Sequence, residues 1–232
     1  MRFFQKLPTL YKFLGIATLV AIAVVVSGLL ITRSFSPTSS VQSPRSLLPQ
    51  GVNKNPSSDR PYLGHLPYSQ AEQSQLMMIG SYAQKQHQRF EFMDIEAGKA
   101  LMQLIYAARD EGVWIVPVSG FRTIEEQKKL FEAQIKRRGS EQAAASFSAP
   151  PGYSEHATGL AVDLTDGRFP KQDVTLEFEK TDAFRWLTRH AKEFGFQMSF
   201  PNNNSQGVSY EPWHWRFVGS PRAAQIFASE PD

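Results

Sequence analysis

The chain has 232 residues, enough for one well-buried domain with additional segments. Its net charge at pH 7 is +3, and no dense run of lysine and arginine accompanies that charge, so the composition gives no support for nucleic-acid binding. Cysteine is absent, which excludes disulfides and thiolate metal ligands. Any metal ion must therefore be held by histidine, aspartate or glutamate.

The N-terminal segment carries a membrane-targeting pattern. A basic stretch over residues 1–12 precedes an uncharged apolar run, Phe13 to Ile31, whose length is close to the roughly 20 residues that span a bilayer as a helix. A cleaved signal peptide usually has a shorter apolar core and a small-residue cleavage site, which Val26-Ser27-Gly28 fits poorly. We therefore expect a transmembrane signal anchor over residues 13–32, with a cleaved signal peptide as the alternative. The basic residues before the run place the N-terminus in the cytoplasm.

A polar segment follows the apolar run. Residues 33–66 are rich in serine, proline, asparagine and glycine, and their few apolar residues show no periodicity, which is typical of a flexible linker. The folded domain is then expected over residues 67–232. This arrangement predicts a single-pass protein of the cytoplasmic membrane, with its folded domain on the extracytoplasmic side, in the periplasm or cell wall.

Helices and short strands alternate in the folded domain. The expected helices cover Ser69–Gln86 (with poor periodicity), Asp94–Glu111, Thr123–Arg138, Thr181–Phe194 and a short stretch after Ser220-Pro221. The expected strands cover Val113–Val118, Gly159–Leu164, Phe196–Phe200 and Tyr210–Val218. Thr123 and Glu126 form a capping box, and Pro117 indicates an edge strand or a bend. The mixture predicts the α+β class.

One strand carries an acid in apolar surroundings. His156 lies shortly before the strand, in which Val162 and Leu164 would point to one face and Asp163 to the other. A carboxylate on so apolar a strand is costly unless it is paired or coordinates a metal. Asp163 and His156 are therefore candidates for one site.

A second histidine lies in an aromatic stretch near the C-terminus. Glu211 precedes His214 by three residues, so the two would face opposite sides of a regular strand. Pro212 must break that regularity if both serve one site. Alone, the stretch fits an aromatic strand with a solvated glutamate and a hydrogen-bonded core histidine better than it fits a functional site. The other histidines, His65, His87 and His190, are expected at the surface.

The combination of these groups points to metal chemistry. Two imidazoles, from His156 and His214, and the carboxylate of Asp163 suit zinc and leave a fourth position for water. Glu211 is then free to act as a general base on that water. Arg122, in the turn before a helix, can hold a substrate carboxylate or stabilise an oxyanion.

Three motifs in this order resemble those of the VanY-type D-alanyl-D-alanine carboxypeptidases. Ser119–Gln127 reads S-G-F-R-T-I-E-E-Q and is similar to S-x-[YF]-R-[ST]-x-x-x-Q. Ser154–Asp163 is similar to S-x-H-x-x-G-x-A-x-D, and Glu211–Arg216 to E-x-W-H-x-R. The resemblance extends from about Ser69 to the end of the chain. Phe121 stands where many relatives have tyrosine, which bears only on fine substrate contacts.

The resemblance implies a fold and a set of roles. The fold would be a small antiparallel sheet with flanking helices, as in the D-Ala-D-Ala metallopeptidases and hedgehog-like domains. Zinc would be bound by His156, Asp163 and His214. Glu211 would be the catalytic base, and Arg122 a contact to the substrate or transition state. The positions expected to line the peptide-binding cleft are Gln127, Tyr153 and Ser154.

The expected activity is that of a zinc-dependent D,D-carboxypeptidase, which removes the C-terminal D-alanine from peptidoglycan stem peptides outside the membrane. An L,D-carboxypeptidase and a peptidoglycan endopeptidase are alternatives, because the same site serves either and the difference rests on cleft residues. A non-catalytic module that binds wall peptides is a third possibility, and the loss of Glu211 or of a ligand would be its signature. We expect a monomer, with the stem peptide and the membrane as partners and no nucleic acid.

Overall fold

The computed structural model describes residues 60–84, 87–169 and 174–228. The expected signal anchor over residues 13–32 and most of the expected linker over residues 33–66 lie outside the described residues. Within those that are described, no helix is both long enough and apolar enough to cross a membrane.

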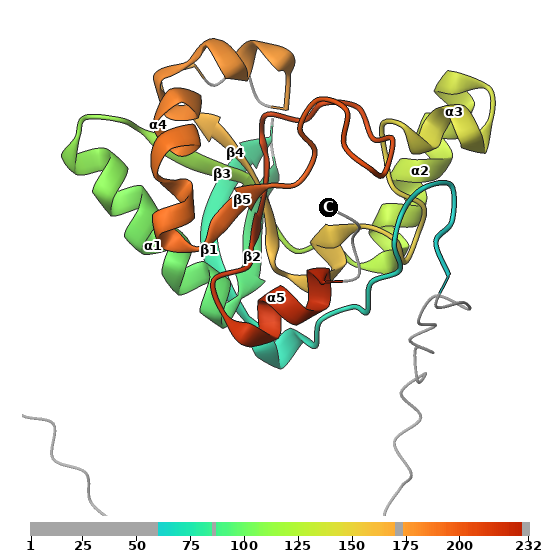
Figure 1. Cartoon of the computed structure of the whole chain (residues 1–232), viewed down its shortest axis with the longest axis horizontal. Helices are drawn as coiled ribbons and strands as arrows, with labels where there is room; N and C mark the ends of the chain where they lie inside the picture. Colours follow the sequence, from blue (N-terminus) through green and yellow to red (C-terminus); the bar gives the residue numbers. More distant parts are fainter. Residues whose placement is uncertain (1–59, 85–86, 170–173, 229–232) are drawn as a thin grey trace, which may run out of the picture. The chain divides into compact units, whose positions relative to one another are not determined.

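Two antiparallel sheets and several helices form the described domain (Figure 1). The first sheet is a hairpin of β1 (Leu76–Gln84) and β2 (His87–Asp94), and the second has the strand order β3-β4-β6-β5. The strands of the second sheet are β3 (Ile115–Ser119), β4 (Ala161–Asp166), β5 (Phe196–Met198) and β6 (His214–Phe217). The helices are α1 (Ile95–Asp110), α2 (Ile124–Arg138), α3 (Glu141–Ala145), α4 (Asp182–His190) and α5 (Pro221–Phe227). The predicted α+β class with an antiparallel sheet is confirmed.

Local capping signals account for where the main helices begin. In α2, the Thr123 hydroxyl accepts from the backbone N–H of Glu126, and the Glu126 carboxylate accepts in return from the N–H of Thr123. Asp94 caps α1 by accepting from the N–H of Glu96, and Thr181 caps α4. These bonds satisfy backbone donors that have no partner inside the helix. The expected helix starts are therefore confirmed.

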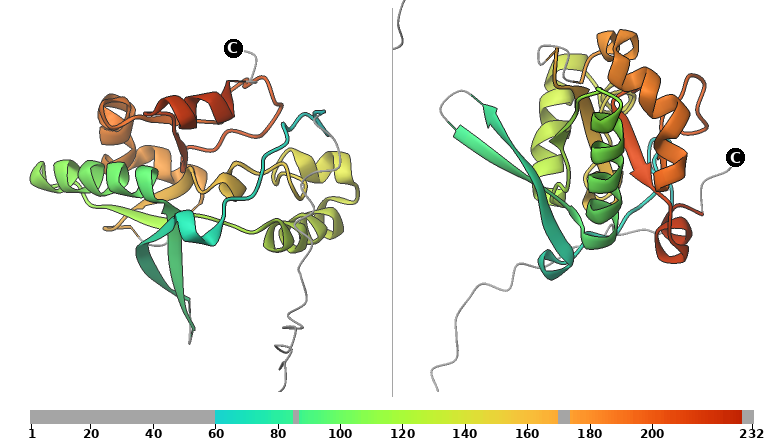
Figure 2. Two further views of the ribbon diagram at one scale, coloured as in Figure 1. Left: turned by 90° about the horizontal axis from the view of Figure 1, so that it is seen from below. Right: turned by 90° about the vertical axis from the view of Figure 1, so that its left-hand side faces the viewer.

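The helical expectation for Ser69–Gln86 is wrong. Apart from a short 3-10 turn at Gln73–Gln75, the segment forms strand β1, which pairs with β2 from Leu76 opposite Asp94 onward. The apolar pattern of the segment does not show the pairing with β2 that holds it extended. Figure 2 shows this hairpin extending away from the helices.

Other elements are shorter than expected. The helix predicted over Thr181–Phe194 is α4 followed by a 3-10 turn at Ala191–Phe194. The strand predicted over Tyr210–Val218 is reduced to β6, because residues 212–213 form a turn before it. β3, which contains Pro117, lies at the end of the sheet order, as the proline indicates.

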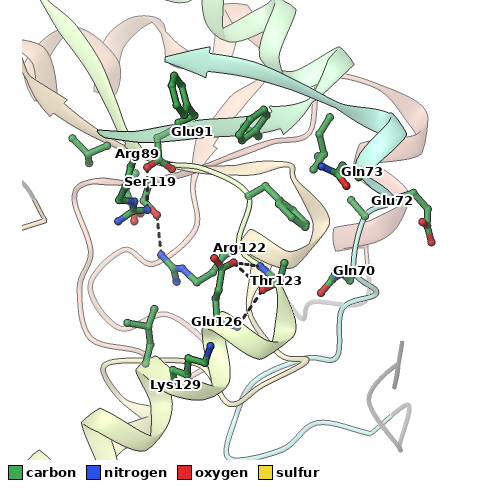
Figure 3. A pocket seen from close by; sticks show the side chains of 18 of the residues that line it. Gln70, Glu72, Gln73, Arg89, Glu91, Ser119, Arg122, Thr123, Glu126 and Lys129 are labelled. Carbon is green, nitrogen blue, oxygen red and sulfur yellow. Dashed lines mark hydrogen bonds and ion pairs between the residues drawn. The ribbon is translucent and has the colours of Figure 1, made fainter. Parts of the chain in front are cut away.

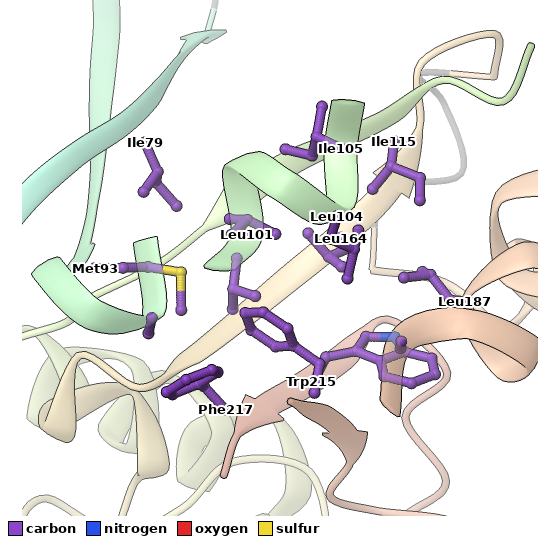
Figure 4. Close-up of a cluster of buried hydrophobic side chains, with 14 of the residues drawn as sticks. Ile79, Met93, Leu101, Leu104, Ile105, Ile115, Leu164, Leu187, Trp215 and Phe217 are labelled. Atoms are coloured by element: carbon purple, nitrogen blue, oxygen red, sulfur yellow. The ribbon is translucent and has the colours of Figure 1, made fainter. Parts of the chain in front are cut away.

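The hydrophobic core lies against one face of the second sheet. Val162 and Leu164 of β4 point into it, as predicted, together with Trp215 of β6. Figure 4 shows side chains of α1 next to this layer, and their buried members are Leu101, Leu104 and Ile105. α4 adds Trp186 and Leu187. The opposite face of β4 and β6 is thus left to polar residues.

His65 is buried, contrary to the surface position we expected. It is 2% exposed, and its Nε2 lies 2.8 Å from the carbonyl oxygen of Ala145. Burial lowers the pKa of His65, so the neutral ring donates this hydrogen bond. The contact spans 80 residues, which explains why a polar local sequence did not predict it. His190 is half-buried beside Glu193, and the side chain of His87 lies outside the described part.

Gly159 provides a test of the fold close to β4. Its φ is +71°, and a Cβ atom would lie 3.0 Å from the backbone nitrogen of Asp94. We expect Gly159→Ala to lower the free energy of unfolding by roughly 1–3 kcal/mol, measured by denaturant titration. Gly112→Ala is the matched control, since Gly112 has a φ of +77° but open space around it and adds conformational strain alone. Equal losses in the two variants would contradict a close-packing role for Gly159.

Candidate metal centre

The sheet register brings the candidate residues together. Asp163 of β4 is the Cα partner of His214 in β6 and also of Ser119 in β3. Side chains of paired residues lie on the same face, so all three face away from the hydrophobic core. His156 reaches the same place from a 3-10 turn at Glu155–Thr158, just before β4.

The three expected ligands form one buried cluster. His156, Asp163 and His214 are 4%, 5% and 3% exposed, and one potential ligand atom from each lies within 4.8 Å of the others. Nε2 of His156 is 3.4 Å from one oxygen of Asp163, and Nδ1 of His214 is 3.1 Å from the other. The structure thus brings together the three side chains that the sequence assigned to a metal.

The remaining ring nitrogens fix the orientation of each imidazole. Nδ1 of His156 is 2.7 Å from the carbonyl oxygen of Gly120, which can only accept, so this nitrogen carries the proton. Nε2 of His214 is 2.8 Å from Oε2 of Glu155 and donates to that carboxylate. The nitrogens that face Asp163 are therefore unprotonated in the neutral rings and available as ligands.

Glu155 is a functional residue that the sequence reasoning missed. It is 3% exposed, and it accepts from Ser199 Oγ at 2.6 Å and from Arg216 Nη1 at 2.9 Å, in addition to His214. A carboxylate that orients a metal-bound histidine also increases the basicity of that ligand. Two signals were present: Glu155 lies between the serine and histidine of the second motif, and Arg216 ends the third.

The electrostatics of the cluster favour a cation. Burial opposes ionisation of Asp163, but His156 and His214 hold the pKa of this carboxyl well below its usual range. Burial likewise disfavours the imidazolium of His214, yet hydrogen bonds to Asp163 and Glu155 raise its pKa to about 10. The same negative field attracts any positive charge placed between the side chains, whether a proton or a metal ion.

Glu211 lies beside the cluster without belonging to it. One oxygen is 3.9 Å from Nδ1 of His214, and the backbone N–H of His214 donates to the Glu211 carbonyl across the turn that contains Pro212. The expected break in the strand is therefore present. Burial, with contributions from Asp163 and Glu155, raises the pKa of Glu211 to about 7, which suits a group that must both take and return a proton.

Arg122 is held rigidly at the edge of the site. Its Nη2 donates to Oγ of Ser119 at 2.9 Å (Figure 3). Its Nη1 donates to Oε1 of Gln127, also at 2.9 Å. Gln127 is 2% exposed, and its amide nitrogen donates to the hydroxyl of Ser148 and the carbonyl of Ala149. Gln127 therefore supports Arg122 from behind, and the direct substrate contact expected of it stays a prediction.

Two clefts meet at the site. A cleft of about 550 Å³ is lined by the three ligands, Glu211, Tyr153 and Ser154. A larger one of about 1150 Å³ lies between the β1–β2 hairpin and the start of α2 (Figure 3). Both include Arg122 and Asp163. The two clefts therefore adjoin at the candidate site.

The donor set fits zinc. Two imidazole nitrogens and a carboxylate are the ligands of many catalytic zinc sites, where the open fourth position serves the reaction. A half-buried carboxylate, Glu211, next to such a trio is the arrangement of a metallohydrolase, in which the base is not itself a ligand. The site therefore has the residues of a zinc-dependent hydrolase.

Comparisons with known proteins specify the family. The family model described as "VanY: D-alanyl-D-alanine carboxypeptidase" matches residues 90–220, more than half of the chain. The chain therefore belongs to the VanY D-alanyl-D-alanine carboxypeptidase family. A D-alanyl-D-alanine carboxypeptidase of Enterococcus faecalis is 37% identical over 148 residues, which cover 59% of this chain and 52% of that protein. The chain thus spans about half the length of this curated relative.

Two solved structures are similar to this chain. The LdcB LD-carboxypeptidase superposes with a TM-score of 0.57 at 32% identity, over 67% of this chain and 73% of its own. A mutant of the vancomycin resistance D,D-pentapeptidase VanY, solved in complex with Zn(II), is also 32% identical, with a TM-score of 0.49 over 65% of this chain and 84% of its own.

Glu155 provides a test of the metal centre. We expect Glu155→Gln to weaken zinc binding by roughly 10–100-fold, measured by competition with a chromophoric chelator. An amide offers one acceptor oxygen to three donors, so it cannot orient His214 and also satisfy Ser199 and Arg216. Glu193→Gln, at an exposed glutamate that contacts His190, is the control. Unchanged zinc affinity in Glu155→Gln would show that Glu155 does not support metal binding.

Proposed function

We propose that this protein is a zinc-dependent D,D-carboxypeptidase that removes the C-terminal D-alanine from peptidoglycan stem peptides. The observation that supports this most directly is the complete site: the three ligands with the half-buried Glu211 beside them, and Arg122 where the two clefts meet. A binding module that had lost its activity would be expected to lack at least one of these groups, and none is missing.

The ligands, Glu211 and Arg122 each have a separate role in the proposed peptide hydrolysis. When bound by His156, Asp163 and His214, zinc supplies a Lewis acid that activates water and the scissile carbonyl. Glu211 takes the proton of the attacking water and delivers it to the leaving amine. Burial lowers the pKa of His156, and the nearby positive charge of Arg122 adds to this effect. The same charge can stabilise negative charge that develops on the substrate.

The fixed position of Arg122 supports a carboxypeptidase, which acts at the C-terminal end of a peptide substrate. A guanidinium pairs with a carboxylate through two parallel hydrogen bonds, and its planar geometry selects for a free C-terminus. Gln127 and Ser119 fix the guanidinium before substrate arrives, so little conformational freedom is lost on binding. An endopeptidase has no need of such a group at this position.

An L,D-carboxypeptidase is the second candidate. The similarity to the LdcB LD-carboxypeptidase favours it, since that structure shares the fold at a TM-score of 0.57. The two activities differ in the configuration of the residue before the scissile bond. Side chains of the cleft must recognise this configuration. Stem peptides with either configuration distinguish the candidates.

We also propose that the protein acts outside the cytoplasmic membrane, to which the apolar run Phe13–Ile31 anchors it, and that it works as a monomer. The location agrees with that of the proposed substrate. Cell fractionation with protease access to spheroplasts tests this, and recovery of the protein in the cytosol would reject it.

Glu211→Ala should retain zinc but lose nearly all turnover. The base contributes on the order of 10²–10⁴-fold to the rate, and it is not a ligand. Metal analysis and kcat on a stem peptide ending in D-alanyl-D-alanine provide the measurement, with Glu193→Ala as the surface control. Near-normal kcat in Glu211→Ala would reassign Glu211 to a structural role.

Arg122→Lys should impair catalysis on peptides with a free C-terminus far more than it impairs zinc binding. Amidation of the substrate's C-terminus should harm the wild type to a similar extent, and the two changes together should not add, because both remove the same ion pair. The comparison needs kcat/KM for both enzymes on both peptides. Efficient cleavage of amidated or cross-linked stems by the wild type would favour an endopeptidase instead.

A further inference from the structure

A buried carboxylate on the hairpin has no part in the site described so far. Glu91 of β2 is 2% exposed, where a carboxylate is costly unless it is hydrogen-bonded and paired. Its Oε1 lies 3.0 Å from Nη2 of Arg89, two residues earlier on the same face of the strand, and its Oε2 accepts from the N–H of Gly120 at 2.9 Å. Figure 3 shows Glu91 and Arg89 side by side at the wall of the larger cleft.

The turn that contains Gly120 is pressed against β2. A Cβ atom on Gly120 would lie 2.2 Å from the carbonyl oxygen of Phe92, so the backbones approach closely only because this residue is glycine. The N–H of Phe121 donates to the same carbonyl at 2.6 Å. Together with the bond to Glu91, these contacts fix the position of the turn on the hairpin.

The other side of this turn holds the metal centre. The carbonyl of Gly120 accepts from Nδ1 of His156 at 2.7 Å, which points Nε2 of the ring toward Asp163. The backbone N–H of Arg122 donates to the carbonyl of His156 at 3.1 Å. The residues that Glu91 anchors therefore set the orientation of a metal ligand and the starting point of the Arg122 side chain.

We infer that Glu91 is a positioning residue for the zinc centre, acting on His156 through Gly120. The inference rests on the zinc site of the proposed function. Groups that hydrogen-bond directly to a metal ligand typically affect metal affinity by 10–100-fold. Glu91 acts on His156 through one intervening residue, Gly120, so its removal should weaken zinc binding by about 10-fold. A purely structural carboxylate would lower stability and leave zinc affinity unchanged.

The experiment compares side chains of similar length at position 91. Glu91→Met removes the acceptor for the N–H of Gly120, while Glu91→Gln retains an acceptor oxygen. Asp94→Ala is the matched control, since Asp94 is a buried carboxylate at the end of the same strand that caps α1. Zinc affinity is measured by competition with a chromophoric chelator, and the Tm of each protein is measured in excess chelator.

The expected result is about 10-fold weaker zinc binding in Glu91→Met, with Glu91→Gln close to the wild type. Asp94→Ala should have a lower Tm and wild-type zinc affinity. The inference is overturned if folded Glu91→Met binds zinc as tightly as the wild type, if Glu91→Gln is as weak as Glu91→Met, or if Asp94→Ala is weakened equally.

If Glu91→Met does not fold, a third variant tests the role of Glu91 in zinc binding. Glu91→Asp keeps the charge beside Arg89 and withdraws the acceptor by one methylene, so weaker zinc binding would support the inference and unchanged binding would overturn it. Zinc binding by the wild-type protein distinguishes failure of this inference from failure of the proposed function. A wild-type protein that binds no zinc would reject the proposed zinc enzyme and this inference together, whereas zinc-binding wild type with unaffected variants would reject this inference alone.

Discussion

The pairing of β4 with β6 is the constraint on which the site depends. It places Asp163 directly opposite His214 on the face that the hydrophobic core leaves free. The core fixes this register, because a shift by one residue would turn Val162 and Trp215 out of the apolar layer and Asp163 into it. The packing of α1 and α4 on one face of the sheet therefore determines the chemistry on the other.

Buried charge is the second feature that unites the structure. Asp163, Glu155 and Glu91 are each 5% exposed or less. Asp163 lies between the two imidazoles, Glu155 accepts from three side chains, and Glu91 accepts from the N–H of Gly120 and pairs with Arg89. Such groups destabilise a fold when a partner is lost, but they hold their surroundings in one arrangement. Here the fixed groups are the two imidazoles and Arg122, which need defined positions if they are to bind a metal and a peptide end.

Much of this could be predicted from the sequence, for physical reasons. Helix caps and strand periodicity are local signals, so α1, α2 and β4 were expected within a few residues of their actual bounds. The ligand trio was expected because its residues lie in motifs. The burial of His65 and the role of Glu91 depend on contacts between residues far apart in the chain, for which the local sequence has no signal. Glu155 lies within the second motif, but its bonds to His214 and Arg216 become visible only in the fold. The β1 strand depends on pairing with β2, which the weak periodicity of its own segment does not show.

The central claim is zinc-dependent removal of one C-terminal D-alanine. Its most direct test is mass spectrometry of two stem peptides after incubation with the purified protein, one ending in D-alanyl-D-alanine and one already shortened by that last residue, each with and without chelator. The account predicts that the first loses a single D-alanine, that the second is unchanged, and that chelator abolishes the reaction until zinc is restored. Cleavage of the shortened peptide in preference to the longer one, or activity that survives chelation, would contradict it.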